Sequence, residues 1–410
     1  MIILHIDMNS FFASAEQQAN PLLRSKPIVV SGKEGTRSVI VAASKEAKVF
    51  GIKTAMLQSE ARSACPHLIF VEPDGEKYDF LHRELVEILK RYTEMVEVFS
   101  IDEAFLDLSG YAKNFEDAEK IAKKIKLEIK NNLGECMTCS IGIAENKLLA
   151  KLASDLKKPD GLIIINDENK KQILEKIKLT DFCGLGRGYE KRLNDLGVDT
   201  VKKLQEFPLD SLIEAFGPAA GNRLREMSFG KDDTPVVSYL FEAEAKSVGR
   251  SYTLPQNTYD KNEIFTVLAH LCEKTGRELR RNSLAGRTLV YYLRYNDFTG
   301  SALRKTLSNF TNDSLKLFQI GFSLLNQFKL LKPVRLVGVH VSNLASDCKQ
   351  LPLWEKDRKQ LALLPFLDKI NDTYGELTIK PAFLLKSKRL RKHVGGFKSR
   401  ESAPGFALKQ

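Results

Sequence analysis

The chain has 410 residues, too many for a single hydrophobic core, and its length predicts about three or four domains. Hydrophobic residues make up 43% and charged residues 28% of the chain, which is typical of globular proteins and excludes an intrinsically disordered chain. The formal net charge of +11 predicts a polyanionic partner, either nucleic acid or an acidic membrane surface, because a basic excess attracts both.

The sequence shows no sign of a membrane span or of export. No apolar stretch approaches the about 20 residues that a spanning helix needs. The apolar residues 1–6 lead to Asp7 without a basic leader, so we expect no signal peptide and no membrane partner. Six scattered cysteines predict reduced thiols and a cytoplasmic protein. Cys136 and Cys139 form a lone CxxC pair, for which strand packing is a simpler interpretation than zinc or redox chemistry.

Three carboxylates at the ends of apolar runs are the first candidates for chemistry. The opening run ends at Asp7, and an alternating pattern over residues 96–109 predicts a β-hairpin with Asp102 and Glu103 in its middle. Because consecutive strand residues point to opposite faces, these two acids can serve one site only at a strand end or a bend. Three buried carboxylates would need cations or would lose their charge by protonation, and Mg²⁺ prefers oxygen ligands shared with substrate phosphates. For each acid alone, a turn cap or a surface strand end is the simpler interpretation.

Two aromatic residues, Phe11 and Phe12, follow Asp7 almost at once. A ring beside a phosphate site could stack on the sugar or base of a nucleotide. Ordinary core packing is an equally open interpretation for each ring.

Residues 13 to about 70 predict a small mixed α/β segment. Strands are expected near residues 27–30 and 38–42, followed by a helix that carries Lys45 and Lys48. Because these lysines are three residues apart, they share a helix face. That face could hold a triphosphate, or it could be a solvated basic face, which is the commoner case.

The next stretch completes a sheet around the hairpin. The expected elements are helices over residues 73–93 and 114–133 and a strand over residues 137–144. Together with the first strand and the hairpin they describe a ferredoxin-like sheet, interrupted after its first strand by an insertion. A helix over residues 146–157 follows and stops at Pro159, so that Lys158 points a cation towards the sheet.

Residues 181–207 have a helix, hairpin, helix rhythm with Gly184 and Gly186 in the hairpin. Glycines at such a loop let backbone N–H groups approach a phosphate without a clashing Cβ. The pattern is typical of sequence-independent binding to a DNA backbone, although a GxG loop alone is weak evidence.

After a linker without clear periodicity, a second α/β unit is expected. Its strands lie near residues 246–252, 287–295 and 334–341, and its helices over residues 261–282 and 311–330. Basic residues outnumber acidic ones nearly two to one between residues 241 and 344. Arg287, Arg294, Arg304 and Lys305 fall on or beside strands, so we expect a positively charged sheet face that binds a nucleic-acid backbone by counterion release.

The segment QLPLW, residues 350–354, is an apolar cluster between charged neighbours and contains the only tryptophan. Short segments with spaced apolar side chains often dock into a pocket on a partner protein. Local packing onto the preceding domain is the alternative.

In this order and spacing, the motifs HIDMNSFFAS, SIDEAFLDLS, CSIGIAENKLLAKLASDLKKPDG, CGLGRG, KSVGRS and QLPLW resemble those of the Y-family DNA polymerases. The resemblance is strongest to the DNA polymerase IV branch and covers nearly the whole chain. It implies a multidomain α/β (α+β) right-hand architecture. The implied parts are a palm (1–12 and 71–165), fingers (13–70), a helix-hairpin-helix thumb (166–231), a linker (232–242), a little finger (243–345) and a tail (346–410).

The resemblance also implies the site residues. Asp7, Asp102 and Glu103 would be catalytic and would bind two Mg²⁺ ions together with the Met8 carbonyl oxygen. Phe12 would be the steric gate against ribose, and Phe11, Phe12, Lys45, Lys48 and Lys158 would bind the nucleotide. Gly184, Gly186, Arg250, Arg287 and Arg294 would contact DNA, and Gln350, Leu351, Leu353 and Trp354 would contact a sliding clamp.

The implied activity is template-directed, low-fidelity translesion synthesis by a monomer that adds dNTPs to a primer 3′-hydroxyl by two-metal phosphoryl transfer. The fingers look too small to close tightly over a base pair. Lys45 and Lys48 replace a tyrosine and an arginine that are frequent in relatives, and lysine lacks the bidentate fork of arginine. Asn9 stands where an aspartate is frequent, at a position that is not usually a metal ligand.

Two other functions fit the sequence less well. A non-catalytic DNA-binding or clamp-binding accessory would not need the three acids. A nucleotide cyclase built on a similar palm would not explain the glycine hairpin or the basic C-terminal half.

Overall fold

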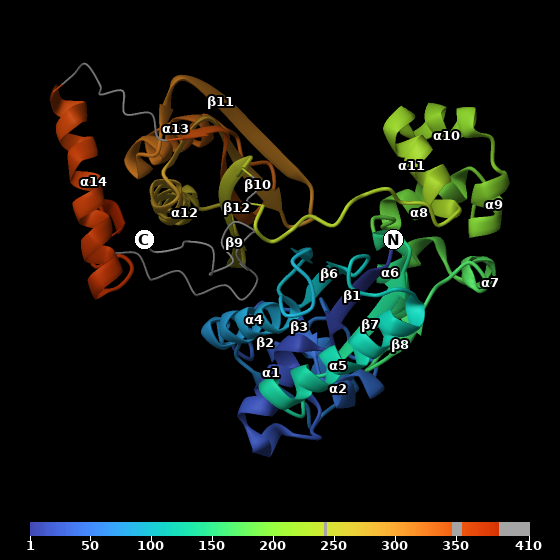
Figure 1. Cartoon of the computed structure of the whole chain (residues 1–410). Coiled ribbons are helices and arrows are strands. Elements are labelled where there is room, and N and C mark those ends of the chain that lie inside the picture. The colour runs from blue at the N-terminus through green and yellow to red at the C-terminus, as the bar shows by residue number, and fades with distance from the viewer. Residues whose placement is uncertain (242–243, 347–354, 385–410) are drawn as a thin grey trace. The chain divides into compact units, whose positions relative to one another are not determined.

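The structure is a computed structural model that describes residues 1–241, 244–346 and 355–384 (Figure 1). It divides into two compact units, one over residues 1–242 and one over residues 243–393, which are described separately. Within the described residues, no helix combines the length and the apolar character that crossing a membrane requires.

The first unit is built on a five-stranded sheet of order β5-β6-β1-β7-β8. Its strands are β1 (Ile3–Met8), β5 (Val96–Val98), β6 (Glu103–Asp107), β7 (Cys139–Ala144) and β8 (Leu162–Ile164). β1 lies between β6 and β7 and is buried over its whole length, as its apolar sequence predicts. The order β7-β1-β6-β5 is that of a ferredoxin-like sheet, and β8 adds a parallel edge strand.

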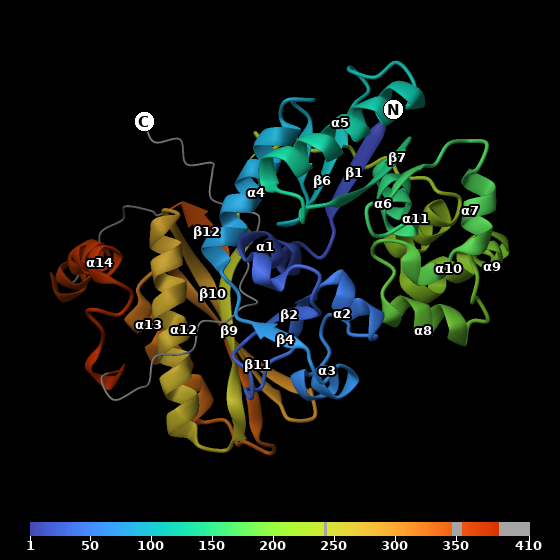
Figure 2. The ribbon, with the colours of Figure 1, turned by 90° about the horizontal axis from the view of Figure 1, so that it is seen from below.

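Helices cover both faces of this sheet (Figure 2). One core cluster joins β1 to α4 (Gly75–Leu89) and α5 (Phe115–Leu133), which also contact each other. A second cluster joins the other face to α6 (Lys147–Leu156). The side chains of Asp74, Asn114 and Asn146 cap the three helices by accepting backbone N–H groups, so each begins where its sequence predicts.

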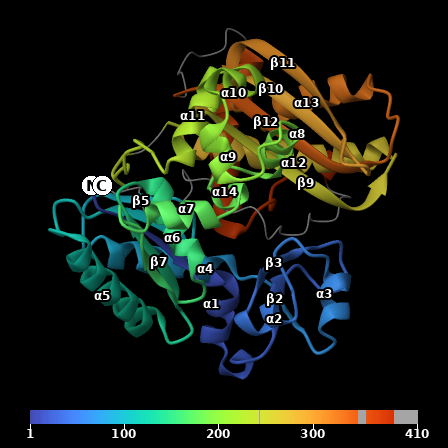
Figure 3. The same cartoon turned by 90° about the vertical axis from the view of Figure 1, so that its right-hand side faces the viewer.

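The insertion after β1 forms a small α/β segment (Figure 3). Part of it packs in a small core cluster of its own. Its elements are α1 (Phe11–Ala19), η1 (Pro21–Leu23), β2 (Ile28–Ser31), β3 (Ile40–Ala43), α2 (Lys45–Val49), α3 (Gln58–Ala64) and β4 (Ile69–Val71). The two expected strands are confirmed as β2 and β3. The sequence analysis missed α3 and β4, because β4 has only three residues and pairs in parallel with β2, which leaves no alternating pattern.

Short helices follow the sheet. They are α7 (Lys170–Lys176), η2 (Leu179–Asp181), α8 (Arg187–Asp195), α9 (Val201–Glu206), α10 (Leu209–Phe216) and α11 (Pro218–Ser228). Their apolar residues join the core cluster of α6. The chain then returns to the sheet: Val236 is buried in the same cluster, and the Val237 N–H donates to Glu97 Oε2 at 3.0 Å. This stretch, expected to be a loose linker, is therefore fixed to the first unit.

The second unit is a four-stranded antiparallel sheet of order β11-β10-β12-β9 with helices on one face. Its elements are β9 (Ser247–Thr258), α12 (Lys261–Arg281), β10 (Leu284–Tyr295), β11 (Gly300–Thr311), α13 (Ser314–Asn326) and β12 (Val334–Ser346). The sequence analysis missed β11. It is an edge strand with mostly exposed residues, so its sequence lacks a regular apolar alternation.

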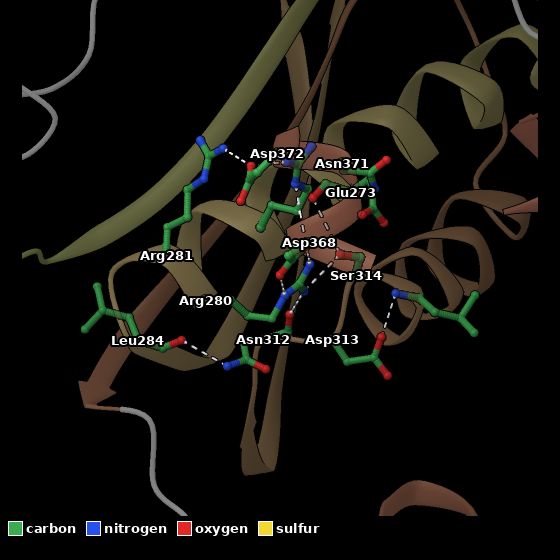
Figure 4. Close-up of polar contacts among 12 residues, drawn as sticks. Glu273, Arg280, Arg281, Leu284, Asn312, Asp313, Ser314, Asp368, Asn371 and Asp372 are labelled. Atoms are coloured by element: carbon green, nitrogen blue, oxygen red, sulfur yellow. Dashed lines mark hydrogen bonds and ion pairs between the residues drawn. The ribbon is translucent and has the colours of Figure 1, made fainter. Parts of the chain in front are cut away.

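A further layer lies on α12. It consists of α14 (Glu355–Tyr374) and η3 (Ala382–Leu384). Arg280 donates two hydrogen bonds to the carboxylate of Asp368, and Arg281 donates to Asp372 (Figure 4). Arg277 also donates to Asp372. These ion pairs fix α14 to the unit and neutralise part of its basic charge.

Candidate active site

The three predicted acids meet at one end of the first sheet. Asp7 lies directly opposite Glu103 in the antiparallel pair of β1 and β6, so both side chains emerge on the same face. Asp102 lies in the turn before β6, and its carbonyl oxygen accepts the N–H of Met8 at 3.0 Å. β5 and β6 pair as the predicted hairpin. The turn therefore lets two consecutive acids approach the end of β1.

Each carboxylate has a partner within the protein. Lys158 Nζ lies 2.5 Å from Asp7 Oδ2, and Lys151 Nζ lies 2.8 Å from Glu103 Oε1. Asp102 Oδ1 accepts the Ser100 hydroxyl at 2.6 Å. Two lysines and one hydroxyl thus surround three acids, and the site retains excess negative charge.

Burial and the neighbouring charges shift the pKa values of two of these acids. Asp7 is 8% exposed, and burial together with the neighbouring Glu103 raises its pKa to about 6 despite the opposing effect of Lys158. Burial, followed by the charge of Asp7, raises the pKa of Asp102, while the Ser100 hydroxyl opposes that shift. A cation added to this site would relieve the unfavourable burial of these charges.

The donor set suits a hard divalent cation. Three carboxylates and the Met8 carbonyl offer only oxygen ligands, which Mg²⁺ prefers. Within the described part of the chain, no three His, Cys, Asp or Glu side chains are arranged to hold a metal as they stand. Asp7 and Glu103 would therefore turn from Lys158 and Lys151 to bind one.

α6 contributes a row of lysines that the sequence analysis did not recognise. Lys147 and Lys151 are four residues apart and share one helix face. Lys147 Nζ lies 2.6 Å from Glu97 Oε2, as Lys151 lies beside Glu103. The spacing of lysines at positions 147, 151 and 158 could have indicated this row. The sequence alone does not show which strand carboxylates these lysines face.

Phe11 and Phe12 form the first turn of α1 and are both buried in the core. Their rings are 5.5 Å apart, and the Phe12 ring lies 4.5 Å from that of Tyr78. The core-packing interpretation is therefore confirmed for both. It does not exclude contact with a nucleotide, since Phe12 lies five residues after Asp7 and remains 8% exposed.

The two lysines of α2 differ in their surroundings. The Lys45 side chain is 75% exposed and lies 3.9 Å from Glu46. Lys48 is also exposed, but desolvation by the surrounding protein lowers its pKa, with a further contribution from the charge of Lys158 and an opposing one from Asp7. Lys48 is therefore within electrostatic range of the acids.

The residues expected to contact DNA differ in their exposure and in their partners. Gly184 has φ +97°, and Gly186 precedes the first turn of α8; neither has an atom within 4 Å of the place where a Cβ would lie. Arg294 is exposed on the sheet of the second unit, and the Arg287 guanidinium lies 5.6 Å from the Phe310 ring. Arg250 instead donates to Glu278 of α12 at 3.0 Å.

The residues expected to contact a clamp, Gln350, Leu351, Leu353 and Trp354, lie outside the described residues.

Comparisons with known proteins match three parts of the chain. Residues 6–155 match the impB/mucB/samB family, residues 245–353 match the C-terminal domain of that family, and residues 180–232 match the thumb domain of DNA polymerase-iota. DNA polymerase IV of Pelotomaculum thermopropionicum is 36% identical over 96% of this chain and 98% of its own length. This chain belongs to the Y family of DNA polymerases, in the DNA polymerase IV group.

Other comparisons agree with this placement. DNA polymerase IV of Clostridioides difficile is 35% identical over 90% of the chain and 98% of the relative. The solved structure of a Y-family DNA polymerase chimera, Dbh-Dpo4(243-245)-Dbh, superposes with a TM-score of 0.74 at 27% identity and covers 84% of this chain and 99% of that chain. The resemblance stated from the motifs and the multidomain polymerase fold are thus confirmed. The Y-family member described here is a DNA-directed DNA polymerase, of a family that depends on metal ions.

Proposed function

We propose that this Y-family polymerase performs low-fidelity synthesis across damaged templates by adding dNTPs to a primer 3′-hydroxyl through two-metal phosphoryl transfer. The observation that carries the proposal is the pairing of Asp7 with Glu103, with Asp102 held beside them by its bond to Met8. Primer–template DNA and a dNTP are the substrates.

In this proposal Asp7, Asp102, Glu103 and the Met8 carbonyl oxygen would hold two Mg²⁺ ions. When bound, the ions lower the pKa of the 3′-hydroxyl and neutralise the triphosphate and the departing pyrophosphate. The protein contributes position and charge: Lys158 releases Asp7 and turns to the triphosphate, and Lys48 adds a second cation. Catalysis is then mostly positioning and electrostatic stabilisation.

Phe12 is the proposed steric gate. Its place at the start of α1, close along the chain to Asp7, supports a ring beneath the sugar that would clash with a 2′-hydroxyl. Phe11 packs against it and limits its movement.

The remaining parts are proposed to hold the DNA. Residues 1–12 and 71–165 would be the palm, 13–70 the fingers, 166–231 the thumb, 232–242 the linker and 243–345 the little finger. The open backbone at Gly184 and Gly186 would bind phosphates, and Arg287 and Arg294 would add charge. Because Arg250 is paired with Glu278, we expect it to contribute less to DNA binding than Arg294 does.

Low fidelity is proposed from the small fingers. Their three-stranded sheet has strands of only three or four residues and a core of its own, which offers little surface to close over a nascent base pair. We also propose a monomer in the cytoplasm whose tail, residues 346–410, binds a sliding clamp through residues 350–354.

Primer extension tests the proposal. Asp102→Ala should abolish extension with Mg²⁺ and dNTPs and leave DNA affinity nearly unchanged, because Asp102 would bind metal rather than DNA. Asp107→Asn is the matched control, since Asp107 lies on the same hairpin but at the far end of β6, opposite Ile3. Retained synthesis by Asp102→Ala, or equal loss in Asp107→Asn, would refute the assignment.

A further inference from the structure

Tyr78 of α4 joins two side chains of α1. Its ring is fully buried and lies 4.5 Å from the Phe12 ring, with the two planes tilted by 38°. Its hydroxyl donates to Glu16 Oε1 at 2.7 Å. Phe12 and Glu16 are four residues apart and therefore lie on one face of α1, so Tyr78 contacts two successive turns of that helix.

Glu16 is a buried carboxylate with both oxygens in use. It is 6% exposed, and Lys77 Nζ donates to its second oxygen at 2.7 Å. Lys77 and Tyr78 are consecutive residues in the first turn of α4. Two consecutive residues of α4 thus bind the two oxygens of one carboxylate on α1, and such charge-assisted hydrogen bonds are stronger and more directional than neutral ones.

The bond at the hydroxyl restricts the ring in a way that packing alone does not. Two tilted aromatic rings attract each other over a broad range of offsets, so ring contact sets their separation only loosely. A hydrogen bond at the far end of the Tyr78 ring fixes its position along α1. The face that Tyr78 presents to Phe12 is then fixed as well.

We propose that Tyr78 and Glu16 are positioning residues that hold the Phe12 ring in place and thereby set the discrimination between deoxyribonucleotides and ribonucleotides. The inference rests on the proposed role of Phe12 as the steric gate. When the hydroxyl bond is lost, the Tyr78 ring shifts, the Phe12 ring gains room, and a 2′-hydroxyl is accommodated at lower cost.

The test compares kcat/KM for a dNTP and for the matching rNTP opposite the same template base. Tyr78→Phe keeps the ring and removes only the hydroxyl, and we expect discrimination to fall about tenfold or more, the range for loss of one hydrogen bond to a charged group. Because both substrates are measured on one enzyme preparation, the ratio is independent of the folded fraction. A purely structural role for the bond would leave the ratio unchanged.

Variants at Glu16 provide the rescue test. Glu16→Ala should lower discrimination as Tyr78→Phe does. Glu16→Gln keeps an oxygen that can accept from the Tyr78 hydroxyl, so we expect it to retain more of the wild-type ratio than Glu16→Ala.

The chain contains a matched control. Tyr92 donates to Glu128 Oε1 at 2.7 Å, and Arg91, the residue before it, donates to Glu128 Oε2 at 3.3 Å. This group repeats the chemistry of Tyr78, Glu16 and Lys77 between α5 and the turn that follows α4. Tyr92→Phe should therefore leave the discrimination ratio at the wild-type value.

The outcomes separate the inference from the proposed function. If Phe12→Ala leaves discrimination unchanged, Phe12 is not the gate, and the steric-gate assignment in the proposed function is wrong. If Phe12→Ala removes discrimination while Tyr78→Phe and Glu16→Ala retain it, the positioning inference is overturned. An equal loss in Tyr92→Phe would also overturn it, because the effect would then be general.

Discussion

At the scale of single residues, lysines stabilise the acids at the end of β1. Lys158 and Lys151 each bind one carboxylate, so negative charges that would be costly to bury are partly compensated. The two lysines come from α6 and the turn that follows it, which keeps both cations close to the sheet. Metal ligation of Asp7 would release Lys158, which also pairs with Asp155 at 2.7 Å, to bind the triphosphate.

Lys158→Met is the variant that tests this role. We expect KM for the dNTP to rise about tenfold or more, the cost of losing one hydrogen bond to a charged group, with a smaller change in kcat. Steady-state kinetics of single-nucleotide addition measures both. Lys157→Met is the control, because the exposed Lys157 is adjacent in sequence and should leave KM unchanged. Equal KM values for the two variants would contradict the role.

The sequence was sufficient to select the acids but not all of their partners. Asp7, Asp102, Glu103 and Lys158 each follow an apolar run or end a helix, so local pattern singled them out. Lys151 and Tyr78 lie inside ordinary amphipathic helices, where a polar residue looks the same whether it faces solvent or a buried carboxylate. Only the packing of helices on the sheet distinguishes the two cases.

At the scale of elements, helices were predicted correctly where the hydrophobic periodicity and the capping residues indicated the same helix. α5 and α6 begin after the asparagines 114 and 146, whose side chains cap them, and both carry long apolar faces. β4 and β11 were missed because one is very short and the other is an exposed edge. Both strands are stabilised by hydrogen bonds with a neighbouring strand, which the residues of the strand itself do not reveal.

The ion pairs between α12 and α14 lead to a prediction about an element. Asp368 is 17% exposed at its side chain and binds Arg280 through both oxygens. Asp368→Asn would leave a buried guanidinium without its charge partner, and we expect the attachment of α14 to weaken by about 3–5 kcal/mol. Hydrogen exchange should then rise in α14 and in the face of α12 that it covers (Figure 4).

The control is Glu355→Gln. Glu355 pairs with Lys359 on the exposed side of α14, where ion pairs contribute little. Exchange in α14 should remain at the wild-type level in this variant. Unchanged exchange in Asp368→Asn would show that apolar contacts alone hold the helix.

At the scale of the whole molecule, the basic excess predicted a polyanionic partner, and the polymerase family supports DNA. The same basic excess did not indicate which individual arginines are free to face the DNA. Arg277 and Arg280 are buried against α14, and Arg250 is paired with Glu278, so these charges hold the second unit together. Charge along a sequence indicates a partner class, whereas the residues that face the partner depend on tertiary packing.

The number of metal ions held by the acids tests the central claim most directly. Mn²⁺ binding to the complex with primer–template and a non-hydrolysable dNTP, followed by electron paramagnetic resonance, reports that number without requiring turnover. The account predicts two ions in the wild-type complex, fewer in Asp7→Ala and Glu103→Ala, and two again in Asp107→Asn. Wild-type metal content in Asp7→Ala and Glu103→Ala would contradict the account.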